Sequence, residues 1–507
     1  MSRINKFAKM AVLASAGLAP GLALASNTTV CSIPTGRDGI NYAHEGVAEM
    51  RAVGPAALAV AADGSFWVAD TVSRRLLHYS STCSQLGIVE LRNVVGISDV
   101  AATNSSLFVF DRAAASPTVV HLSLSGTEYG RYTVDADVTG LALGERGELL
   151  TEHKGGASFK QLLDSSGKLS VASLPGMTKS GMVYNAVAAD MSKVDASTGT
   201  ITVGSRTVEV KVPNAVGGLR VLGIQGDGSF FVKMEEVSLP SDFRVDQTVR
   251  YYDMNGNLRG MARVPLQGLY TYVENGLATG AAGAYALVTF RDRAEIQKLG
   301  FSDSLAAILP VVTTSTTEPA PITGQCRSST DMANTASWIT GFQRAYSSTN
   351  VDGYCAGRTK PRFLGGAGIA YTGEAYDWGG WDNPTNYDNL LYQNYQAGDI
   401  NTAGVESCSR GLDCSGLVSL AWGTTSKYGT STLPNISWQL GSRSGMARGD
   451  IMNCAGSHVV LFDYYNGNGL NVWEATTSNY YDRAVYVYRD WGYFGSCYVP
   501  RRYNSKC

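Results

Sequence analysis

Apolar and polar residues alternate in short strand-like pieces that recur through the N-terminal half of the chain. "AVAADGSFWVAD" (Ala59–Asp70) has the pattern of an apolar strand, a polar turn and a second strand. Related pieces follow at "VAATNSSLFVFD" (Val100–Asp111), "LALGERGELLTE" (Leu141–Glu152) and "LGIQGDGSFFVK" (Leu222–Lys233). The second strands of the first three align in steps of 41 residues at Val68, Val109 and Leu150, and the fourth lies two steps further on. The pattern predicts a repeated unit with one degenerate copy.

Most units contain a second hairpin with a polar turn, as in "LSLSGTEYG" (Leu122–Gly130). Two hairpins give a four-stranded sheet, and a period near 40 residues is typical of propeller blades. Blade one begins near Pro55 and Leu277–Phe290 begins the last, which predicts about six blades in residues 26–310. The first unit, Gly54–Ser80, also resembles an NHL-type propeller repeat. The alternative is a plain β-sandwich, which has no reason to repeat such a unit.

A change of composition marks a boundary after the propeller. "VVTTSTTEPAPITG" (Val311–Gly324) is rich in Thr and Pro and has no apolar periodicity, so it is interpreted as a semi-extended linker. A long surface loop inside one domain is the alternative. The linker predicts a second domain over residues 325–507, which we expect to fold alone while the propeller holds it to a partner.

The first 25 residues have the three parts of a secretory signal. A basic start is followed by an apolar run (Ala11–Leu24) and a small-x-small site (Ala23–Ala25). A membrane anchor is the alternative, but Pro20 and the glycines make the run short and broken for a span. We therefore expect a protein that is exported, to the periplasm or secreted, with no membrane span after cleavage.

Charge and histidine content narrow the classes of partner. The full chain has a net charge of −2, which becomes −5 when the three basic residues of the signal are removed. No basic block stands out, which argues against a nucleic-acid partner. The four histidines of the propeller half do not cluster in sequence, and we expect neither a metal nor a cofactor.

Nine cysteines, an odd number, leave one over when disulfides form in an exported chain. In "RGLDCSGLVSLAWG" (Arg410–Gly423) the apolar residues are spaced for a helix, with Asp413 as the N-cap candidate. A thiol on the first turn faces the positive end of the helix dipole, which favours the thiolate. We predict that Cys414 is the remaining thiol and a nucleophile, and that Cys31 pairs with Cys83. A structural cysteine is the alternative.

Residues 325–507 contain one histidine that can serve as the base. His458 lies in "ARGDIMNCAGSHVVLFDYY" (Ala447–Tyr465), where side chains alternate as in a strand. Glu474 is an acidic residue in the otherwise apolar and aromatic strand "LNVWEATTS" (Leu470–Ser478), and we expect it to orient the imidazole. An exposed strand position is the alternative for Glu474.

The order of these motifs resembles the NlpC-type, papain-like cysteine peptidases of bacterial cell walls. The resemblance covers Tyr371–Tyr488 and rests on "AYDWGGWD" (Ala375–Asp382), "DCSGLV" (Asp413–Val418), "RGDIM" and "SHVVLF". It implies that an all-β propeller is followed by an α+β papain-like domain. It also implies a Cys-His-Glu triad of Cys414, His458 and Glu474.

By the same resemblance, Tyr376 would reach into the catalytic cleft, and Asp413, Ser415 and Ser457 would line the substrate side. Two departures stand out. The third catalytic position is often His, Asn or Gln in that family and is Glu here. The insert Trp381–Leu412 is longer than usual and could cover the cleft and change the substrate.

The implied function is hydrolysis of an amide bond in peptidoglycan stem peptides, such as the D-glutamyl–diamino-acid bond, through a thioester on Cys414. The propeller would hold a wall polysaccharide or a protein partner. Two other classes stay open. One is an acyltransferase or amidase that acts on a lipid or a protein, and the other is a propeller adhesion or scaffold protein with a silent catalytic domain.

Overall fold

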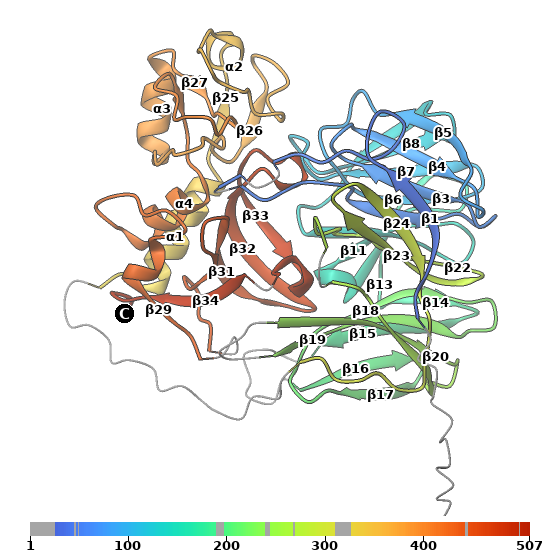
Figure 1. Ribbon diagram of the computed structural model, residues 1–507. Coiled ribbons are helices and arrows are strands. Elements are labelled where there is room, and N and C mark those ends of the chain that lie inside the picture. The colour runs from blue at the N-terminus through green and yellow to red at the C-terminus, as the bar shows by residue number, and fades with distance from the viewer. Residues whose placement is uncertain are drawn as a thin grey trace, which may run out of the picture.

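The computed structural model describes residues 26–44, 47–48, 50–188, 197–238, 244–266, 269–309, 326–441, 445–495 and 497–507 (Figure 1). The predicted signal peptide (1–25) and linker (311–324) lie outside these residues. The chain forms a ring of antiparallel four-stranded sheets and, after it, a mixed half with helices and a six-stranded sheet.

The ring has six four-stranded sheets, which confirms the predicted propeller. Blade 1 is β2 (Ala57–Val60), β3 (Phe66–Asp70), β4 (Arg75–Tyr79) and β5 (Gln85–Glu90). Blade 2 is β6 (Ile97–Ala102), β7 (Ser106–Asp111), β8 (Thr118–Ser123) and β9 (Glu128–Thr133). Blade 3 is β10 (Val138–Leu143), β11 (Leu149–His153), β12 (Ser158–Leu163) and β13 (Leu169–Leu174), with the short 3-10 helix η1 (Lys154–Gly156) after β11.

Blades 4 and 5 continue the pattern. Blade 4 is β14 (Met177–Lys179), β15 (Met182–Ala188), β16 (Thr198–Val203) and β17 (Arg206–Lys211), and is the unit whose repeat is degenerate in sequence. Blade 5 is β18 (Ala215–Ile224), β19 (Phe230–Ser238), β20 (Arg244–Tyr252) and β21 (Leu258–Arg263).

Blade 6 is completed by the other end of the propeller. Its strands β22 (Leu277–Gly280), β23 (Gly283–Phe290) and β24 (Arg293–Lys298) are joined by β1 (Thr28–Pro34), which pairs antiparallel with β24. The predicted Cys31–Cys83 disulfide is confirmed and ties β1 to blade 1. Strand pairing and disulfide therefore close the ring, and the cross-link restricts the unfolded chain.

The Asp-Gly-Ser turns explain why the repeated hairpins form locally. The Asp63 carboxylate accepts hydrogen bonds from the Ser65 backbone N–H (2.9 Å) and hydroxyl (2.7 Å), and Asp227 holds Ser229 in the same way. Gly64 takes a φ of +84°, which costs a glycine little. Hydrogen bonds between residues close in sequence thus stabilise the turn of the first hairpin in these blades.

The C-terminal half is a helix-on-sheet arrangement. Its six-stranded antiparallel sheet has the order β29 (Ser437–Gln439), β34 (Tyr498–Tyr503), β30 (Ile451–Cys454), β31 (His458–Asn466), β32 (Gly469–Thr476) and β33 (Arg483–Arg489). Helices α1 (Ser329–Thr340) and α4 (Cys414–Trp422) pack together and against this sheet. The 3-10 helix η2 (Leu433–Ile436) leads from α4 into β29, and η3 (Ser478–Tyr480) and η4 (Trp491–Tyr493) join later strands of the sheet.

A small lobe, seen at the top of Figure 1, contains most of the insert Trp381–Leu412. It consists of β25 (Gln343–Ala345), α2 (Ser348–Asp352), β26 (Ala370–Thr372), α3 (Pro384–Tyr392), β27 (Gln396–Ala397) and β28 (Ser409–Arg410). Its own buried core includes Tyr346, Phe363 and Tyr387, and the Cys355–Cys408 disulfide crosses it. The insert therefore packs with the segment before the motifs to form a separate unit.

The disulfides fit an exported protein. Besides the two pairs already described, Cys326 pairs with Cys507 and Cys454 with Cys497. Four disulfides indicate an oxidising environment. None of the helices in the described ranges is long and apolar enough to span a lipid bilayer.

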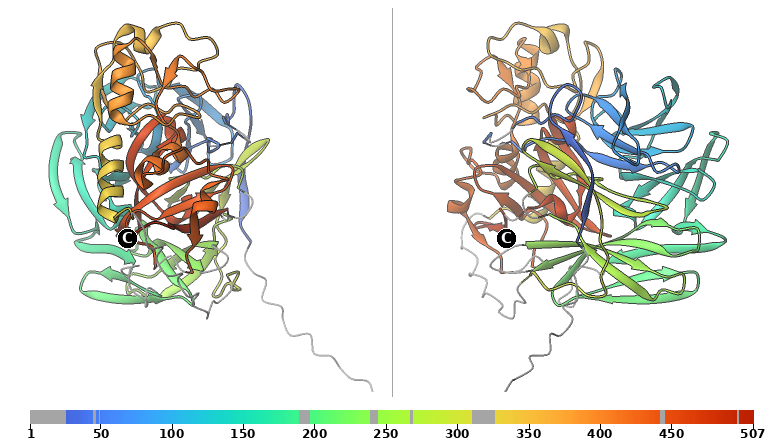
Figure 2. Two further views of the ribbon diagram at one scale, coloured as in Figure 1. Left: turned by 90° about the vertical axis from the view of Figure 1, so that its left-hand side faces the viewer. Right: turned by 45° about the vertical axis from the view of Figure 1, so that its right-hand side comes forward.

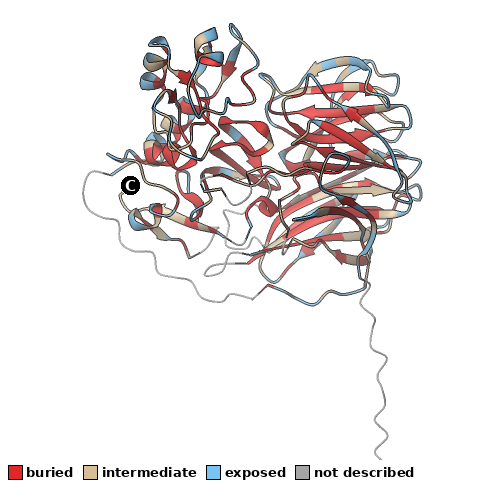
Figure 3. Cartoon of the chain, turned by 45° about the horizontal axis from the view of Figure 1, so that its top comes forward, coloured by how far each residue is buried: buried red, intermediate tan, exposed pale blue. Residues whose placement is uncertain are grey.

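The six-stranded sheet lies against one side of the propeller, as the views in Figure 2 show. One apolar core joins Val237 and Val245 of blade 5 to Val460, Phe462 and Trp491 of the C-terminal half. Strands of both halves are largely buried in Figure 3. The two halves thus share a core.

One amide from the turn between β31 and β32 enters the propeller. Asn468 Nδ2 donates to the carbonyls of Gly155 (3.1 Å) and Ala186 (3.2 Å), and its Oδ1 accepts from the backbone N–H groups of Ala188 (2.8 Å) and Leu219 (3.1 Å). These partners belong to blades 3, 4 and 5. A buried amide with both donors and its acceptor engaged fixes this turn in place.

The other blades also contact the C-terminal half through hydrogen bonds: Tyr480 to the Val72 carbonyl in blade 1 (2.6 Å), Arg483 to the Ala114 carbonyl in blade 2 (3.0 Å), and Tyr272, just before blade 6, to Asp490 (2.7 Å). Blades 1 to 5 and the segment that leads into blade 6 therefore contact it. Residues far apart in sequence build a common interface, and independent folding of residues 325–507 stays a prediction.

Candidate active site

Cys414 is the first residue of α4, as the motif predicts. Asp413 caps the helix, and its Oδ1 accepts from the Gly416 N–H (2.8 Å) and the Ser415 hydroxyl (2.9 Å). Cys414 is buried and forms no disulfide, whereas the other eight cysteines form four. Its place at the helix N-terminus favours the thiolate.

His458 and Glu474 meet on adjacent strands. His458 begins β31, and its Nε2 lies 2.8 Å from Oε2 of Glu474 on β32. Both side chains are almost fully buried. Because Nε2 is engaged with the carboxylate, Nδ1 is the ring nitrogen left to exchange a proton with a nucleophile. Helix α4, which begins at Cys414, packs against both strands.

Two further side chains hold Glu474. Arg489, the last residue of β33, donates to Oε1 of Glu474 through Nε (2.8 Å) and also through Nη2. The Tyr493 hydroxyl donates to Oε2 (3.1 Å), and the Arg489 guanidinium lies over the Tyr493 ring at 4.2 Å. Burial raises the pKa of Glu474, but the charge of Arg489 and the hydrogen bond from His458 lower it to about 2. Glu474 is therefore ionised at neutral pH.

Arg489 and Tyr493 hold the candidate catalytic residue Glu474 and were not predicted from the sequence. Arg489 is a charged residue that ends an apolar, aromatic strand, which is the same signal that singles out Glu474. Tyr493 follows in an aromatic stretch with no polar pattern to distinguish it.

The propeller reaches this network through one carboxylate. Glu274, just before β22, accepts from Arg112 Nη1 at 3.0 Å and lies 3.8 Å from Arg489 Nη1. Asn479 also donates to Glu274. Arg489 therefore lies between the propeller carboxylate Glu274 and the candidate catalytic carboxylate Glu474.

The other residues implied by the family resemblance lie around Cys414. Tyr376 is buried in the same apolar cluster as Cys414. Asp413 is fully buried, and its Oδ2 accepts from the Gly379 N–H (3.0 Å) and pairs with Lys427. Ser415 is fully buried as well. The structure gives Asp413 and Ser415 a place in the helix cap, and their contact with substrate stays a prediction.

A cavity of about 340 Å³ lies between the two halves of the chain. Ser457, next to His458, lines it, and so does Tyr498. Burial raises the pKa of Tyr498 well above its usual value; the charges of Tyr493, Glu474 and Cys414 also raise it, and the charge of Arg51 lowers it. The Tyr498 ring lies 6.4 Å from the ring of Tyr493, whose hydroxyl donates to Glu474. Among the described residues, the lining comes from the propeller and from segments around Ser457 and Tyr498, with none from Trp381–Leu412.

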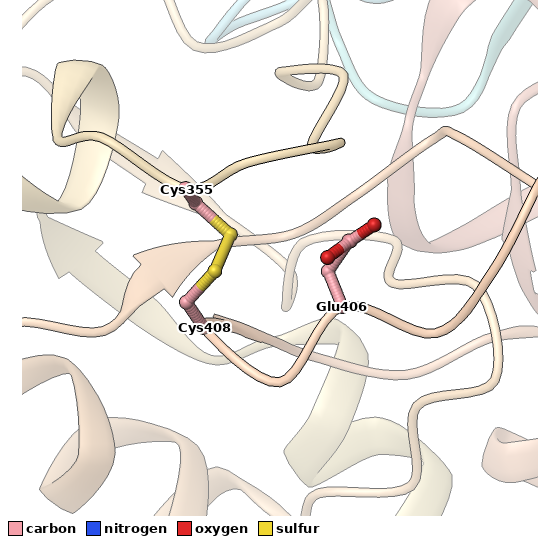
Figure 4. A group of neighbouring side chains, drawn as sticks. All are labelled: Cys355, Glu406 and Cys408. Carbon is pink, nitrogen blue, oxygen red and sulfur yellow. A yellow bond between two sulfur atoms is a disulfide. The ribbon is translucent and has the colours of Figure 1, made fainter.

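Two groups of side chains are close enough together to be considered as metal ligands. Figure 4 shows the first, Cys355, Glu406 and Cys408, in which the two sulfur atoms are bonded to each other at 2.01 Å. Metal ligation by cysteine requires the thiolate, so this group is a cross-link. The second group joins His153 to acidic residues at the propeller surface, where Lys160 already pairs with Asp135 at 2.5 Å.

No protein-family model matches this sequence, and no curated protein matches it. Solved structures resemble its propeller half. A streptogramin B lyase aligns with 54% of this chain and 98% of its own, at 10% identity and a TM-score of 0.30. Virginiamycin B lyase from Staphylococcus aureus aligns with 53% and 97% (11% identity, TM-score 0.31), and a DUF4221 family member from Bacteroides vulgatus with 55% and 99% (6% identity, TM-score 0.36). Likenesses this distant agree with a propeller-like all-β fold over about half the chain and carry no argument about function.

Proposed function

We propose that this protein is an exported cysteine hydrolase that cleaves an amide bond in peptidoglycan stem peptides. Cys414 is the nucleophile, His458 the general base and Glu474 the residue that orients the imidazole. The observation that carries the proposal is the buried hydrogen bond between His458 and Glu474, on the strands that pack against the helix beginning at Cys414. The motif order of NlpC-type, papain-like peptidases supports the same roles.

The chemistry follows from this arrangement. His458 Nδ1 accepts the Cys414 proton, and the thiolate attacks the amide carbonyl. Protonated His458 then gives the proton to the leaving amine, and water, activated by the same imidazole, resolves the thioester. Ionised Glu474 stabilises the imidazolium, and Arg489 and Tyr493 keep the carboxylate in position. Backbone N–H groups near Cys414 would bind the oxyanion.

Access to Cys414 requires a side chain to move, because the thiol is buried in this structure. Tyr498 lines the cavity, and its ring lies 6.4 Å from that of Tyr493, which donates to Glu474.

The propeller, in this proposal, also attaches the protein to a wall polymer or a protein partner. Its face toward the C-terminal half is occupied, but its central channel also opens into a cavity of about 270 Å³. The lining includes residues from the first strand of every blade, among them Asp99 and Arg220, and also Glu152 from the second strand of blade 3. A polar channel of this kind suits a polar ligand.

The test is to incubate the mature protein with purified muropeptides and to identify the fragments by mass. Cleavage of a stem-peptide amide by the parent, and none by Cys414→Ala, is the expected result. Glu474→Gln should keep some activity because its amide oxygen can still accept from the imidazole N–H. If Glu474→Ala behaves like the parent, another residue orients His458. If no muropeptide is cleaved, the proposed substrate class is wrong.

A further inference from the structure

The cavity beside the triad is built by both halves of the chain. Arg51, Leu266 and Tyr272 of the propeller half line it together with Ser457, Phe494 and Tyr498 of the C-terminal half. Ser457 precedes His458, and the Tyr498 ring lies 6.4 Å from that of Tyr493, whose hydroxyl donates to Glu474. A substrate in this cavity would therefore touch propeller residues while its reacting bond lies near the triad.

Arg51 is held in this wall by aromatic residues. Its guanidinium lies 3.9 Å from the centroid of the Tyr493 ring and 5.6 Å from that of Tyr272. One nitrogen, Nη1, donates to the Tyr493 carbonyl. These contacts orient the planar group and leave its remaining N–H donors for another partner.

The charge of Arg51 has no carboxylate partner among the described residues. Within the described ranges, which omit 45, 46 and 49, Arg51 forms no ion pair with a carboxylate. None of the described residues that line the cavity is Asp or Glu. Glu274 lines a smaller cavity that Arg51 also borders, but it accepts from Arg112 and Asn479. Arginines taken out of water are normally paired with an anion, because removing a charge from water is costly. An arginine without a carboxylate at the wall of a cavity is arranged to receive one from a ligand.

We propose that Arg51 is the carboxylate-binding residue of the substrate groove. It holds an acidic group of the peptide while Cys414 attacks an amide bond of the same peptide, so this inference rests on the hydrolase function proposed above. The planar guanidinium matches a carboxylate through paired N–H donors. Leu266 and Phe494 give the neighbouring aliphatic part of the peptide an apolar surface. The substrate class is thus narrowed to acidic peptides.

The test compares two stem peptides of one sequence, one with free carboxylates and one with carboxamides in their place. Parent, Arg51→Gln and Arg51→Lys are assayed as full-length chains. Arg146→Gln is the matched control, because Arg146 is 80% exposed on the propeller surface away from the cavity. Arg51→Gln should lower kcat/KM for the acidic peptide about 10- to 100-fold more than for the amidated one, chiefly through KM. Arg51→Lys should recover part of this preference as a point charge.

A binding measurement separates this proposal from the proposed function. In the Cys414→Ala background, calorimetry should show weaker binding of the acidic peptide after Arg51→Gln, by about the same 10- to 100-fold. If the parent cleaves neither peptide, the hydrolase assignment fails and the calorimetry still decides the role of Arg51. Equal losses on both peptides, or an unchanged Kd for the acidic one, would overturn the carboxylate site.

Discussion

Two arginines that lie against Tyr493 come from different halves of the chain and have opposite electrostatic surroundings. Arg489 donates to Glu474 and lies near Glu274, so its charge is matched by carboxylates on both sides of the interface. Arg51 stacks on the same ring and forms no ion pair with a carboxylate of the described residues. The difference separates a structural arginine from a candidate binding residue. Arg489, whose charge is matched by carboxylates, holds the proposed triad in place, whereas Arg51, which has no ion pair among the described residues, lies at a cavity.

Removing either of the proposed reacting groups, Cys414 or His458, should have the largest effect on turnover. Cys414→Ala and His458→Ala should each lower turnover by at least about 10⁴-fold, because each takes away a group that acts on the reacting bond. Circular dichroism and the thermal midpoint should stay close to those of the parent. A variant that keeps a tenth of the parent's turnover on muropeptides would show that the triad is elsewhere.

Replacing each arginine by leucine tests directly whether the two differ in their contribution to stability. Arg489→Leu leaves Glu474 buried without its main partner and should lower the free energy of unfolding by about 3–5 kcal/mol. Arg51→Leu removes a charge without an ion pair among the described residues, two ring contacts and one hydrogen bond, so it should cost less, about 1–2 kcal/mol. Guanidinium denaturation of both variants measures the difference. Equal losses would mean that Arg51 is as much a part of the framework as Arg489.

Low pH should lower the stability of the folded protein, because Glu474, the partner of Arg489, becomes protonated. The pKa of this carboxyl is lowered to about 2 in the folded protein, below its ordinary value near 4.5. The folded state therefore gains stability above the ordinary pKa and loses it as the pH falls toward 2, by an amount on the order of 3 kcal/mol. Unfolding midpoints between pH 5 and 2.5 should fall more steeply for the parent than for Glu474→Gln. Parallel curves would contradict the depressed pKa.

The smallest effect on turnover is expected from the propeller carboxylate Glu274. Glu274→Gln keeps the shape of the side chain and leaves the Arg489–Glu474 contact intact, so it should lower the free energy of unfolding by about 1–2 kcal/mol, chiefly through Arg112. Turnover should stay within about threefold of the parent. A loss of turnover as large as that of His458→Ala would mean that the propeller controls the triad itself.

Local and repeated signals made much of the fold predictable from sequence. The 41-residue spacing predicts the blades, because each unit builds one sheet from its own hairpins. The start of α4 at Cys414 follows from a helix cap and apolar spacing. An acidic residue in an apolar strand predicts the Glu474–His458 hydrogen bond.

Contacts between distant segments could not be predicted. Strand β1 pairs with β24 across most of the propeller sequence, and one isolated strand carries no sign of its partner. Neither Asn468 nor Arg51 belongs to a sequence motif, and the contacts of each depend on how the two halves of the chain pack together. Arg51 meets Tyr493 across 442 residues. The shared cavity is therefore visible only in the structure.

The central claim is that Cys414, activated by His458, carries the reaction. The most direct measurement follows alkylation by iodoacetamide with intact mass and peptide mapping, alongside the remaining activity on muropeptides. We predict that activity falls in proportion to label at Cys414, and that at pH 6 labelling is slower in His458→Ala than in the parent because the imidazole no longer stabilises the thiolate. Activity that survives full labelling of Cys414, or turnover by a protein whose Cys414 stays unlabelled, would contradict the account.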